Sequence, residues 1–362
     1  MTNAQTIPET SMQGDRGVTR SSDTALSDVV LEVNHLKKYF PLQSSGFLRR
    51  TIGYIKAVDD VSFEVRRGET VGVIGESGCG KTTLGRCVSY LYEPTGGEII
   101  IRNGDQEFRM EKLGRGNNAE FRKTVQVIFQ DPFSSLNPRM NVLRIVGEPL
   151  LVNGIAEGRE LEERVSAMVR KVGLNVEHLR RFPHSFSGGQ RQRIGIARAL
   201  VINPQLVVAD EPVSALDVSI QAQVLNLLND LQQEFGLSYL FISHSMSVIR
   251  YMSDRILVMY AGKLVETGPR DELLRQPAHP YTEMLLRSVP KVTQRPSRRL
   301  QEVAEGEPPN LLNLPKGCIF HPRCKYAQEI CRAERPELRP IGTGRQVACH
   351  LSEQLDLQGV FD

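Results

Sequence analysis

The chain has 362 residues, with 45 lysines and arginines against 42 aspartates and glutamates, and a formal net charge of +3. A charge this close to balance gives no electrostatic reason to expect nucleic acid as a partner. No apolar run reaches the roughly 18 residues that a membrane-spanning helix needs. The length allows one large domain with an appendage, and we expect a chain that does not cross a bilayer by itself.

The N-terminal segment, residues 1–28, is polar throughout and lacks the basic start and apolar centre of a secretion signal. We expect it to be disordered and the protein to stay in the cytosol. Structural disulfides are not expected in that compartment, so the six cysteines need another explanation. Four of them crowd the C-terminal tail: Cys318, Cys324, Cys331 and Cys349.

Short apolar or β-branched runs alternate with helical patterns along the middle of the chain. This alternation predicts an α/β core with a mostly parallel sheet covered by helices. Segment 57–65, followed by a turn, predicts an antiparallel flank. The expected strands are 71–74, 125–129, 206–209, 240–242 and 256–259, and the expected helices are 83–91, 160–172, 190–201 and 218–234.

The predicted organisation has three parts. A core domain over 29–270 follows the N-terminal segment and contains a helical subdomain at about 134–185, where charge and helical periodicity increase. Residues 271–362 form a small C-terminal extension that carries the four cysteines.

Residues 75–82, Gly-Glu-Ser-Gly-Cys-Gly-Lys-Thr, match the phosphate-loop pattern between a predicted strand and a predicted helix. That context argues against a glycine-rich turn that matches by chance. Glycines let backbone N–H groups surround phosphates, and the helix that follows adds its positive end. Lys81 is expected to reach the β- and γ-phosphates and Thr82 to ligate Mg²⁺, whereas the Cys79 thiol has no expected role.

A buried strand, 206–209, is followed by the carboxylates Asp210 and Glu211. An acid at the end of a strand beside a phosphate loop can hold Mg²⁺ through water, which we expect of Asp210. Glu211 could orient or polarise the attacking water. Acids at strand ends are also often merely solvated, so the pair alone does not decide the function.

Residues 185–193, Ser-Phe-Ser-Gly-Gly-Gln-Arg-Gln-Arg, resemble the signature of ABC ATPases, with Phe186 where leucine is commoner. Ser187 suits a helix N-cap, and the glycines leave backbone donors uncovered, so this helix end is a second anion site. The resemblance implies a head-to-tail pair in which one subunit's signature closes over the ATP of the other. In that role it implicates Ser187, Gly188, Gly189 and Gln190.

Other residues resemble elements of the same family. Gln130 resembles the Q-loop glutamine, Asp217 the D-loop aspartate and His244 the switch histidine. The resemblance implies Glu211 as general base and His244 as a contact to the γ-phosphate. Tyr39 resembles the aromatic that stacks on adenine, with Phe40 the less favoured choice. The implied ATP-binding set is Tyr39, Gly75, Ser77, Gly78, Cys79, Gly80, Lys81, Thr82, Thr83 and Gln130, with Thr82, Gln130 and Asp210 around Mg²⁺.

Segments 131–140, 181–184 and 279–282 resemble the ATPase subunits of oligopeptide and dipeptide importers. The spacing of Cys318, Cys324, Cys331 and Cys349 resembles the C-terminal cluster motif of that branch and implies a [4Fe–4S] cluster. Zinc and free thiols stay open as alternatives, and the absence of a C-x-x-C pair weakens the case for zinc.

The resemblance implies an ATP-hydrolysing motor subunit of a bacterial peptide importer, bound peripherally at the cytoplasmic face of the inner membrane. Its implied partners are a second ABC ATPase, by preference a paralogue, two transmembrane permease subunits and an extracytoplasmic substrate-binding protein, with no nucleic acid. Import of another small solute, such as nickel or glutathione, is one alternative. A soluble ABC ATPase of DNA repair or translation is another, although such proteins usually carry a long coiled-coil insertion or two ATPase halves, neither of which is found here.

Overall fold

The computed structural model describes residues 28–43, 50–112, 118–131, 133–287 and 309–360. The expectation of disorder at the N-terminus concerns residues that lie, except for Asp28, outside this part of the chain. Within it, no helix is both long and apolar enough to cross a membrane.

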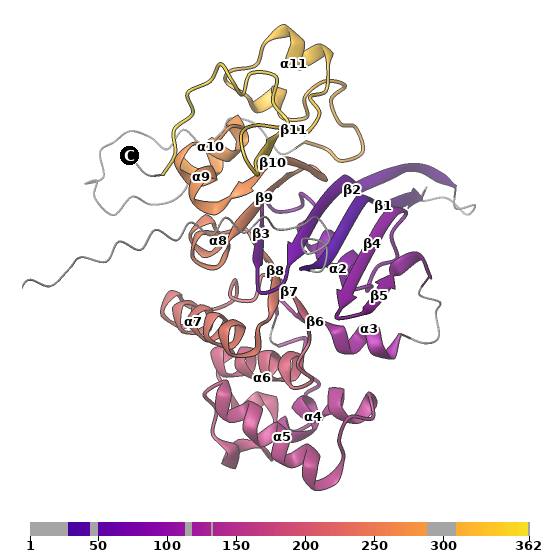
Figure 1. The fold of residues 1–362 in the computed structure, drawn as a ribbon, viewed down its shortest axis with the longest axis vertical. Helices are drawn as coiled ribbons and strands as arrows, with labels where there is room; N and C mark the ends of the chain where they lie inside the picture. Colours follow the sequence, from indigo (N-terminus) through magenta and orange to yellow (C-terminus); the bar gives the residue numbers. More distant parts are fainter. Residues whose placement is uncertain (1–27, 44–49, 113–117, 132, 288–308, 361–362) are drawn as a thin grey trace, which may run out of the picture.

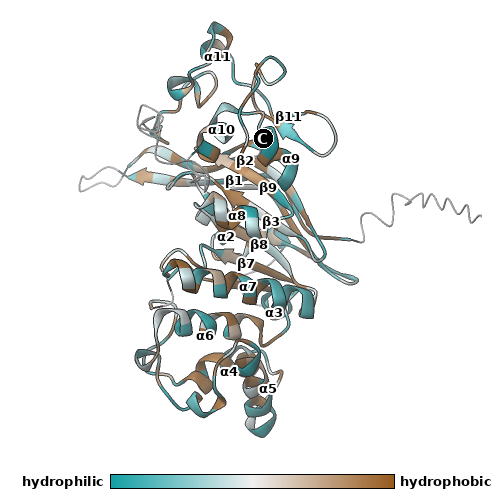
Figure 2. Cartoon of the chain, turned by 90° about the vertical axis from the view of Figure 1, so that its left-hand side faces the viewer, coloured by the Kyte–Doolittle hydropathy of each residue, from teal (hydrophilic) through white to brown (hydrophobic). Residues whose placement is uncertain are grey.

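The centre of the molecule is an eight-stranded sheet with the order β11-β12-β10-β9-β3-β8-β7-β6. Its parallel strands are β3 (Thr70–Ile74), β6 (Val125–Ile128), β7 (Leu206–Asp210), β8 (Ser238–Ser243) and β9 (Arg255–Tyr260). Strands β3, β7 and β8 are buried along their whole length, as expected for parallel strands covered on both faces. Figure 2 shows hydrophobic residues running along these strands. The predicted parallel core is therefore confirmed.

Beside this sheet lies a four-stranded antiparallel sheet with the order β2-β1-β4-β5. Its strands are β1 (Val29–Gln43), β2 (Thr51–Arg66), β4 (Gly96–Asn103) and β5 (Gln106–Arg109). The sequence predicted one strand at 57–65. Strand β2 is longer because its first half pairs with the outer half of β1, where the residues are more exposed and the apolar alternation is weak.

The described part of the chain also contains α-helices, several of which pack on the main sheet. They are α2 (Lys81–Val88), α3 (Ala119–Thr124), α4 (Val142–Val152), α5 (Gly158–Lys171), α6 (Gly188–Leu200), α7 (Val218–Phe235), α8 (Met246–Met252), α9 (Arg270–Arg275), α10 (Pro280–Arg287) and α11 (Glu329–Ala333). Short 3-10 turns occupy Met110–Lys112, Val176–His178, Pro183–Ser185 and His321–Arg323. The predicted helix 83–91 ends earlier than expected, because Ser89 caps α2 and Tyr90 adopts a φ of 55°.

Helices α4 and α5 lie at one end of the molecule and pack against each other and against α6 (Figure 1). Both follow β6 in the chain and precede the signature segment. The boundaries of the core domain and of its helical subdomain stay predictions.

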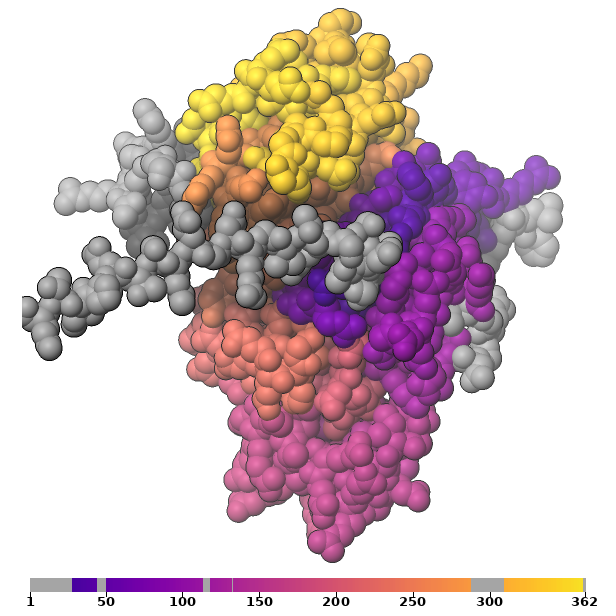
Figure 3. Space-filling model, viewed as in Figure 1, coloured from indigo at the N-terminus to yellow at the C-terminus, as the bar shows by residue number. Residues whose placement is uncertain are grey.

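Residues 309–360 form a cap at the opposite end of the molecule (Figure 3). Their two short strands, β11 (Arg339–Pro340) and β12 (Gln346–Val347), extend the main sheet, because β12 pairs antiparallel with β10 (Lys263–Pro269). Ile319 and Phe320 are buried in the same hydrophobic cluster as the strands of the core. Residues 309–360 are thus packed onto the core, and the name C-terminal extension is used for them below; the predicted start of the extension at residue 271 stays a prediction.

Candidate functional site

The phosphate loop connects β3 to α2 and is built by close backbone contacts. A Cβ on Gly75 would lie 2.1 Å from the carbonyl oxygen of Met259, and one on Gly80 would lie 2.0 Å from that of Ala57. Gly80 also has a φ of 108°, which side chains disfavour. Lys81 Nζ donates to the carbonyl oxygens of Gly75, at 2.7 Å, and Glu76, at 2.9 Å. The glycines are therefore required for the loop to close around its lysine.

The two carboxylates after β7 lie beside this loop. The hydroxyl of Thr82 donates to Asp210 Oδ1 at 3.0 Å, so two of the three residues expected at Mg²⁺ are in direct contact. Burial raises the pKa of Asp210, although the hydrogen bond from Thr82 opposes that shift. An oxygen pair at the carboxyl end of a buried strand is suited to a hard cation.

Glu211 faces the same space and is held by two side chains. Its Oε2 accepts a hydrogen bond from Gln130 Nε2 at 3.0 Å and lies 3.0 Å from His244 Nδ1. Glu211 has a φ of 48°, a conformation that a non-glycine residue keeps only where the surroundings fix it, and its N–H donates to the carbonyl oxygen of Ile242. The residues expected to act on the attacking water are thus brought together.

These groups surround a cavity of about 430 Å³ at the carboxyl ends of the parallel strands. One side offers Lys81 and the positive end of α2 to an anion, and the other offers the carboxylate of Glu211. Such a cavity can hold a polyphosphate, a cation and a water molecule between them. Its lining residues are Ala57, Ser77, Gly78, Gly80, Lys81, Thr82, Thr83, Gln130, Glu211 and His244. Ala57 was not predicted, because its apolar side chain carries no chemical signal in the sequence.

The two aromatic candidates for adenine do not line this cavity. The Tyr39 hydroxyl donates to Asp59, and Lys56 lies over its ring at 5.4 Å. Phe40 packs edge-on against Tyr92, with 5.6 Å between ring centroids. The adenine-stacking role of Tyr39 therefore stays a prediction.

The signature residues lie at the start of α6 and form no part of the cavity lining. Ser187 Oγ accepts from Gln190 N at 3.3 Å, and Gln190 Oε1 accepts from Ser187 N at 3.0 Å, which makes a complete capping box. Gly189 is packed tightly, since a Cβ there would lie 2.5 Å from Ile220. Asp217 stands at the N-cap of α7 without a side-chain capping bond. The chain therefore presents a second helix end separate from its own phosphate loop.

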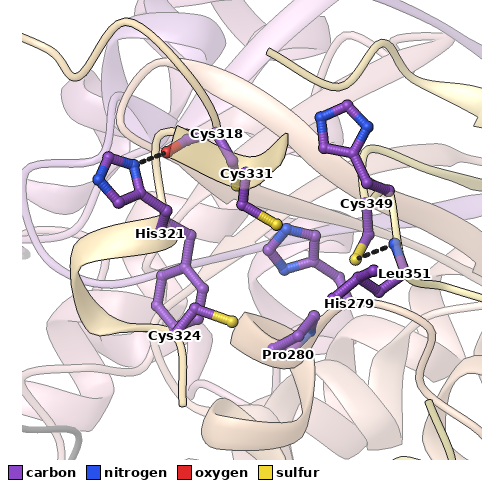
Figure 4. Close-up of a pocket in the computed structure, with 10 residues that line it drawn as sticks. His279, Pro280, Cys318, His321, Cys324, Cys331, Cys349 and Leu351 are labelled. Carbon is purple, nitrogen blue, oxygen red and sulfur yellow. Dashed lines mark hydrogen bonds between the residues drawn. The ribbon is translucent and has the colours of Figure 1, made fainter. Parts of the chain in front are cut away.

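The four cysteines of the tail line one small cavity, together with His279 and His321 (Figure 4). The cavity measures about 10 Å³, roughly what one water molecule needs. Burial raises the pKa of Cys324 to about 11 and that of Cys349 to about 12.

Among the described residues, no group of three or more His, Cys, Asp or Glu side chains is arranged to hold a metal ion. The expected [4Fe–4S] or zinc site is therefore not supported. The spacing of the cysteines predicted that they gather, which they do, but among the described residues their side chains do not form a metal-binding arrangement.

The comparisons with known proteins agree with this geometry. The family described as ABC transporter matches residues 58–214, and the family described as oligopeptide/dipeptide transporter, C-terminal region, matches residues 265–331. The oligopeptide transport ATP-binding protein AppF of Bacillus subtilis is 50% identical over 329 residues, which cover 90% of this chain and 98% of that protein. The di/tripeptide transport ATP-binding protein DppF of Pseudomonas aeruginosa is 46% identical over 327 residues, covering 90% and 99%.

The solved structure of the ATP-binding cassette MJ0796, a dimer bound to ADP and Pi, matches with a TM-score of 0.57 and 28% identity, covering 66% of this chain and 98% of that one. The α/β ATPase fold expected from the sequence is confirmed. The chain belongs to the family of ABC transporter ATP-binding proteins and is an ABC-type ATPase.

Proposed function

We propose that this ATPase powers the import of peptides as the motor subunit of a membrane transporter. The observation that carries the ATPase part of this proposal is the site itself, in which a glutamate held by Gln130 and His244 faces the phosphate loop. The match of residues 265–331 to the C-terminal region of oligopeptide and dipeptide transporters supports peptides as the solute.

We assign the nucleotide contacts as follows. The N–H groups of the loop and Lys81 bind the phosphates, and Thr83 lies next to them in the lining. Thr82, Asp210 and Gln130 hold Mg²⁺, directly or through water. When bound, Mg²⁺ neutralises charge on the phosphates and orients them.

Hydrolysis depends on the geometry around Glu211. Its carboxylate accepts a proton from the attacking water as general base, while Gln130 and His244 fix its orientation. His244 Nδ1 lies 3.0 Å from the carboxylate, so Nε2 is the ring nitrogen left for the γ-phosphate, to which it donates when the ring carries both protons.

A single chain does not complete this site. The start of α6 with Ser187 would close over the ATP of a second subunit, and Asp217 would lie at the interface. We propose a paralogue as that subunit, two transmembrane permeases as the membrane partners and an extracytoplasmic binding protein as the donor of peptide. The assembly would place this chain peripherally at the cytoplasmic face of the inner membrane.

The four cysteines would provide the donor set of a [4Fe–4S] cluster or of zinc, and we propose metal binding because all four line one cavity. Iron, sulfide and zinc analysis of anaerobically purified protein decides the question. Protein that contains iron and sulfide, with broad absorption near about 400 nm, supports the cluster. Metal-free protein leaves the packed thiols as the resting state and removes the proposal.

The transport proposal is tested by affinity capture of the tagged chain from detergent-solubilised cells, followed by reconstitution of the captured complex in vesicles. We expect a second ATPase and two multi-span proteins, and ATP-dependent uptake of a labelled di- or oligopeptide. Uptake of nickel or glutathione instead of the labelled peptide would show that the transported solute is a different one. Capture of ribosomes or repair factors alone would overturn transport and leave the ATPase intact.

A further inference from the structure

The phosphate loop is tied to the C-terminal extension through one glutamate. Both oxygens of the Glu76 carboxylate accept from Arg323, whose terminal nitrogens lie at 2.6 Å and 2.9 Å. The Arg323 side chain is only 6% exposed. A two-point arginine–carboxylate pair fixes direction as well as distance. The place of a loop residue thus depends on a residue 247 positions later in the chain.

A second contact holds the backbone of the same residue. The N–H of Glu76 donates to the Tyr281 hydroxyl at 2.7 Å. Tyr281 packs on Tyr260, at the end of β9, and on Phe320 of the C-terminal extension, with ring centroids at 4.5 Å and 5.4 Å. The guanidinium of Arg323 lies about 6 Å from the rings of both Tyr260 and Phe320. Helix α10, strand β9 and the extension therefore form one packed support behind the loop.

The other side of Glu76 faces the lysine that binds phosphate. Its carbonyl oxygen accepts from Lys81 Nζ at 2.9 Å and from the N–H of Cys79 at 3.3 Å. The carboxylate, the N–H and the carbonyl oxygen of Glu76 all form hydrogen bonds. A shift of the Glu76 side chain would therefore also move its carbonyl oxygen, which accepts the hydrogen bond from Lys81.

The charges of Glu76 and Arg323 also indicate a role in phosphate binding. A carboxylate within a phosphate loop repels the phosphates, and in a partly buried site this repulsion is stronger than in water. The positive charge of Arg323 compensates the charge of Glu76. Because the Arg323 side chain is almost fully buried, water does not compete with Glu76 for it.

We propose that Arg323 is a positioning residue for nucleotide binding, and that through its pair with Glu76 the C-terminal extension sets the affinity of the phosphate loop for ATP. The inference rests on the assignment of the loop as the ATP site and is independent of the transported solute.

The test is the Kd of the purified full-length chain for MgATP, together with KM and kcat for hydrolysis. Arg323→Ala should raise the Kd at least about tenfold, equivalent to about 1.4 kcal/mol, and should raise KM more than it lowers kcat. Arg323→Lys keeps the charge but loses the two-point geometry, so it should be intermediate. In a Glu76→Gln background, Arg323→Ala should cost less than about threefold, because no carboxylate is left uncompensated.

The matched control is Lys325→Ala, which removes a cation of the extension that pairs with Glu283, at 3.5 Å, and not with the loop. Its Kd should stay within about twofold of the wild type. The proposal is overturned if Arg323→Ala binds MgATP as well as the wild type, or if the loss is equally large in the Glu76→Gln background. If Arg323→Ala fails to fold, as judged by circular dichroism, the Arg323→Lys and Glu76→Gln pair is compared in the same way. A wild-type chain without affinity for MgATP would instead refute the assignment of the loop.

Discussion

Glu211 is the residue on which turnover depends most directly in the proposed mechanism. Replacing it with glutamine keeps its size and its contact to Gln130 but removes the base. We expect Glu211→Gln to bind MgATP within about threefold of the wild type and to hydrolyse it at least about 100-fold more slowly. Steady-state phosphate release and equilibrium nucleotide binding measure the two effects. Glu163→Gln, at an exposed pair on α5, is the control that should leave both unchanged; wild-type turnover of Glu211→Gln would dismiss this residue as the base.

Asp59 gives a dependence of stability on pH. Burial by itself would raise its pKa, but hydrogen bonds from Tyr39 and Lys263 and the charge of Lys263 outweigh burial, so the pKa lies below its ordinary 3.8. The unfolded state then binds the proton more tightly, so Asp59 stabilises the folded state above about pH 4 and loses that effect as the pH falls through its folded pKa.

We therefore expect Asp59→Asn to lower the free energy of unfolding by roughly 2 kcal/mol at pH 7. The difference from the wild type should be nearly constant from pH 7 to about pH 4 and should shrink as the pH falls further, through the folded pKa of Asp59. Urea denaturation at pH 7, 4 and 3 measures it. Asp60→Asn is the neighbour control, because Asp60 pairs with His35 at the surface, where ion pairs contribute little. A pH-independent difference would show that the charge of Asp59 is not the cause.

The start of α6 stabilises its helix and is proposed to meet the ATP of a partner subunit. Comparing an N-cap substitution in α6 with one in α4 distinguishes these two roles. Ser187 caps α6 and Asn141 caps α4, where its side chain accepts from Arg144 N at 3.0 Å. Ser187→Ala and Asn141→Ala should each cost about 1 kcal/mol of stability, the usual value of an N-cap.

Only Ser187→Ala should also slow hydrolysis in the assembled pair of subunits, because only that helix end is proposed to meet a partner's ATP. Thermal unfolding and ATPase assays of the reconstituted complex distinguish the two. Equal losses of activity in both variants would mean that α6 contributes stability alone.

Much of the core could be predicted because its signals are local. The loop 75–82 follows a continuous apolar strand, and Asp210 and Glu211 end another, so the parallel topology alone brings them to one edge. The contact of Arg323 with Glu76 could not be predicted, because nothing near either residue specifies a partner so far away in the chain. The spacing of the cysteines indicated that the four thiols lie together. It could not predict how closely residues such as His279 pack around them, because those residues come from other parts of the chain.

The shared hydrophobic cluster makes the core and the C-terminal extension one folding unit. Phe320 packs against both Tyr260 and Tyr281, and β12 is paired with β10. We expect the full-length chain to unfold in a single calorimetric transition and a chain ending at residue 308 to unfold at a lower temperature. Two well-separated transitions in the full-length protein would contradict this unity.

The pairing of β12 with β10 also bears on solubility. Without it, the backbone of Glu266 and Thr267 would form an open edge of a long, apolar sheet, the kind of surface on which a second chain can add as a strand. The sheet ends instead in β11, which has only two residues, one a charged arginine and the other Pro340, which has no N–H to donate. The tail that contacts the phosphate loop thus also protects the molecule from edge-to-edge aggregation.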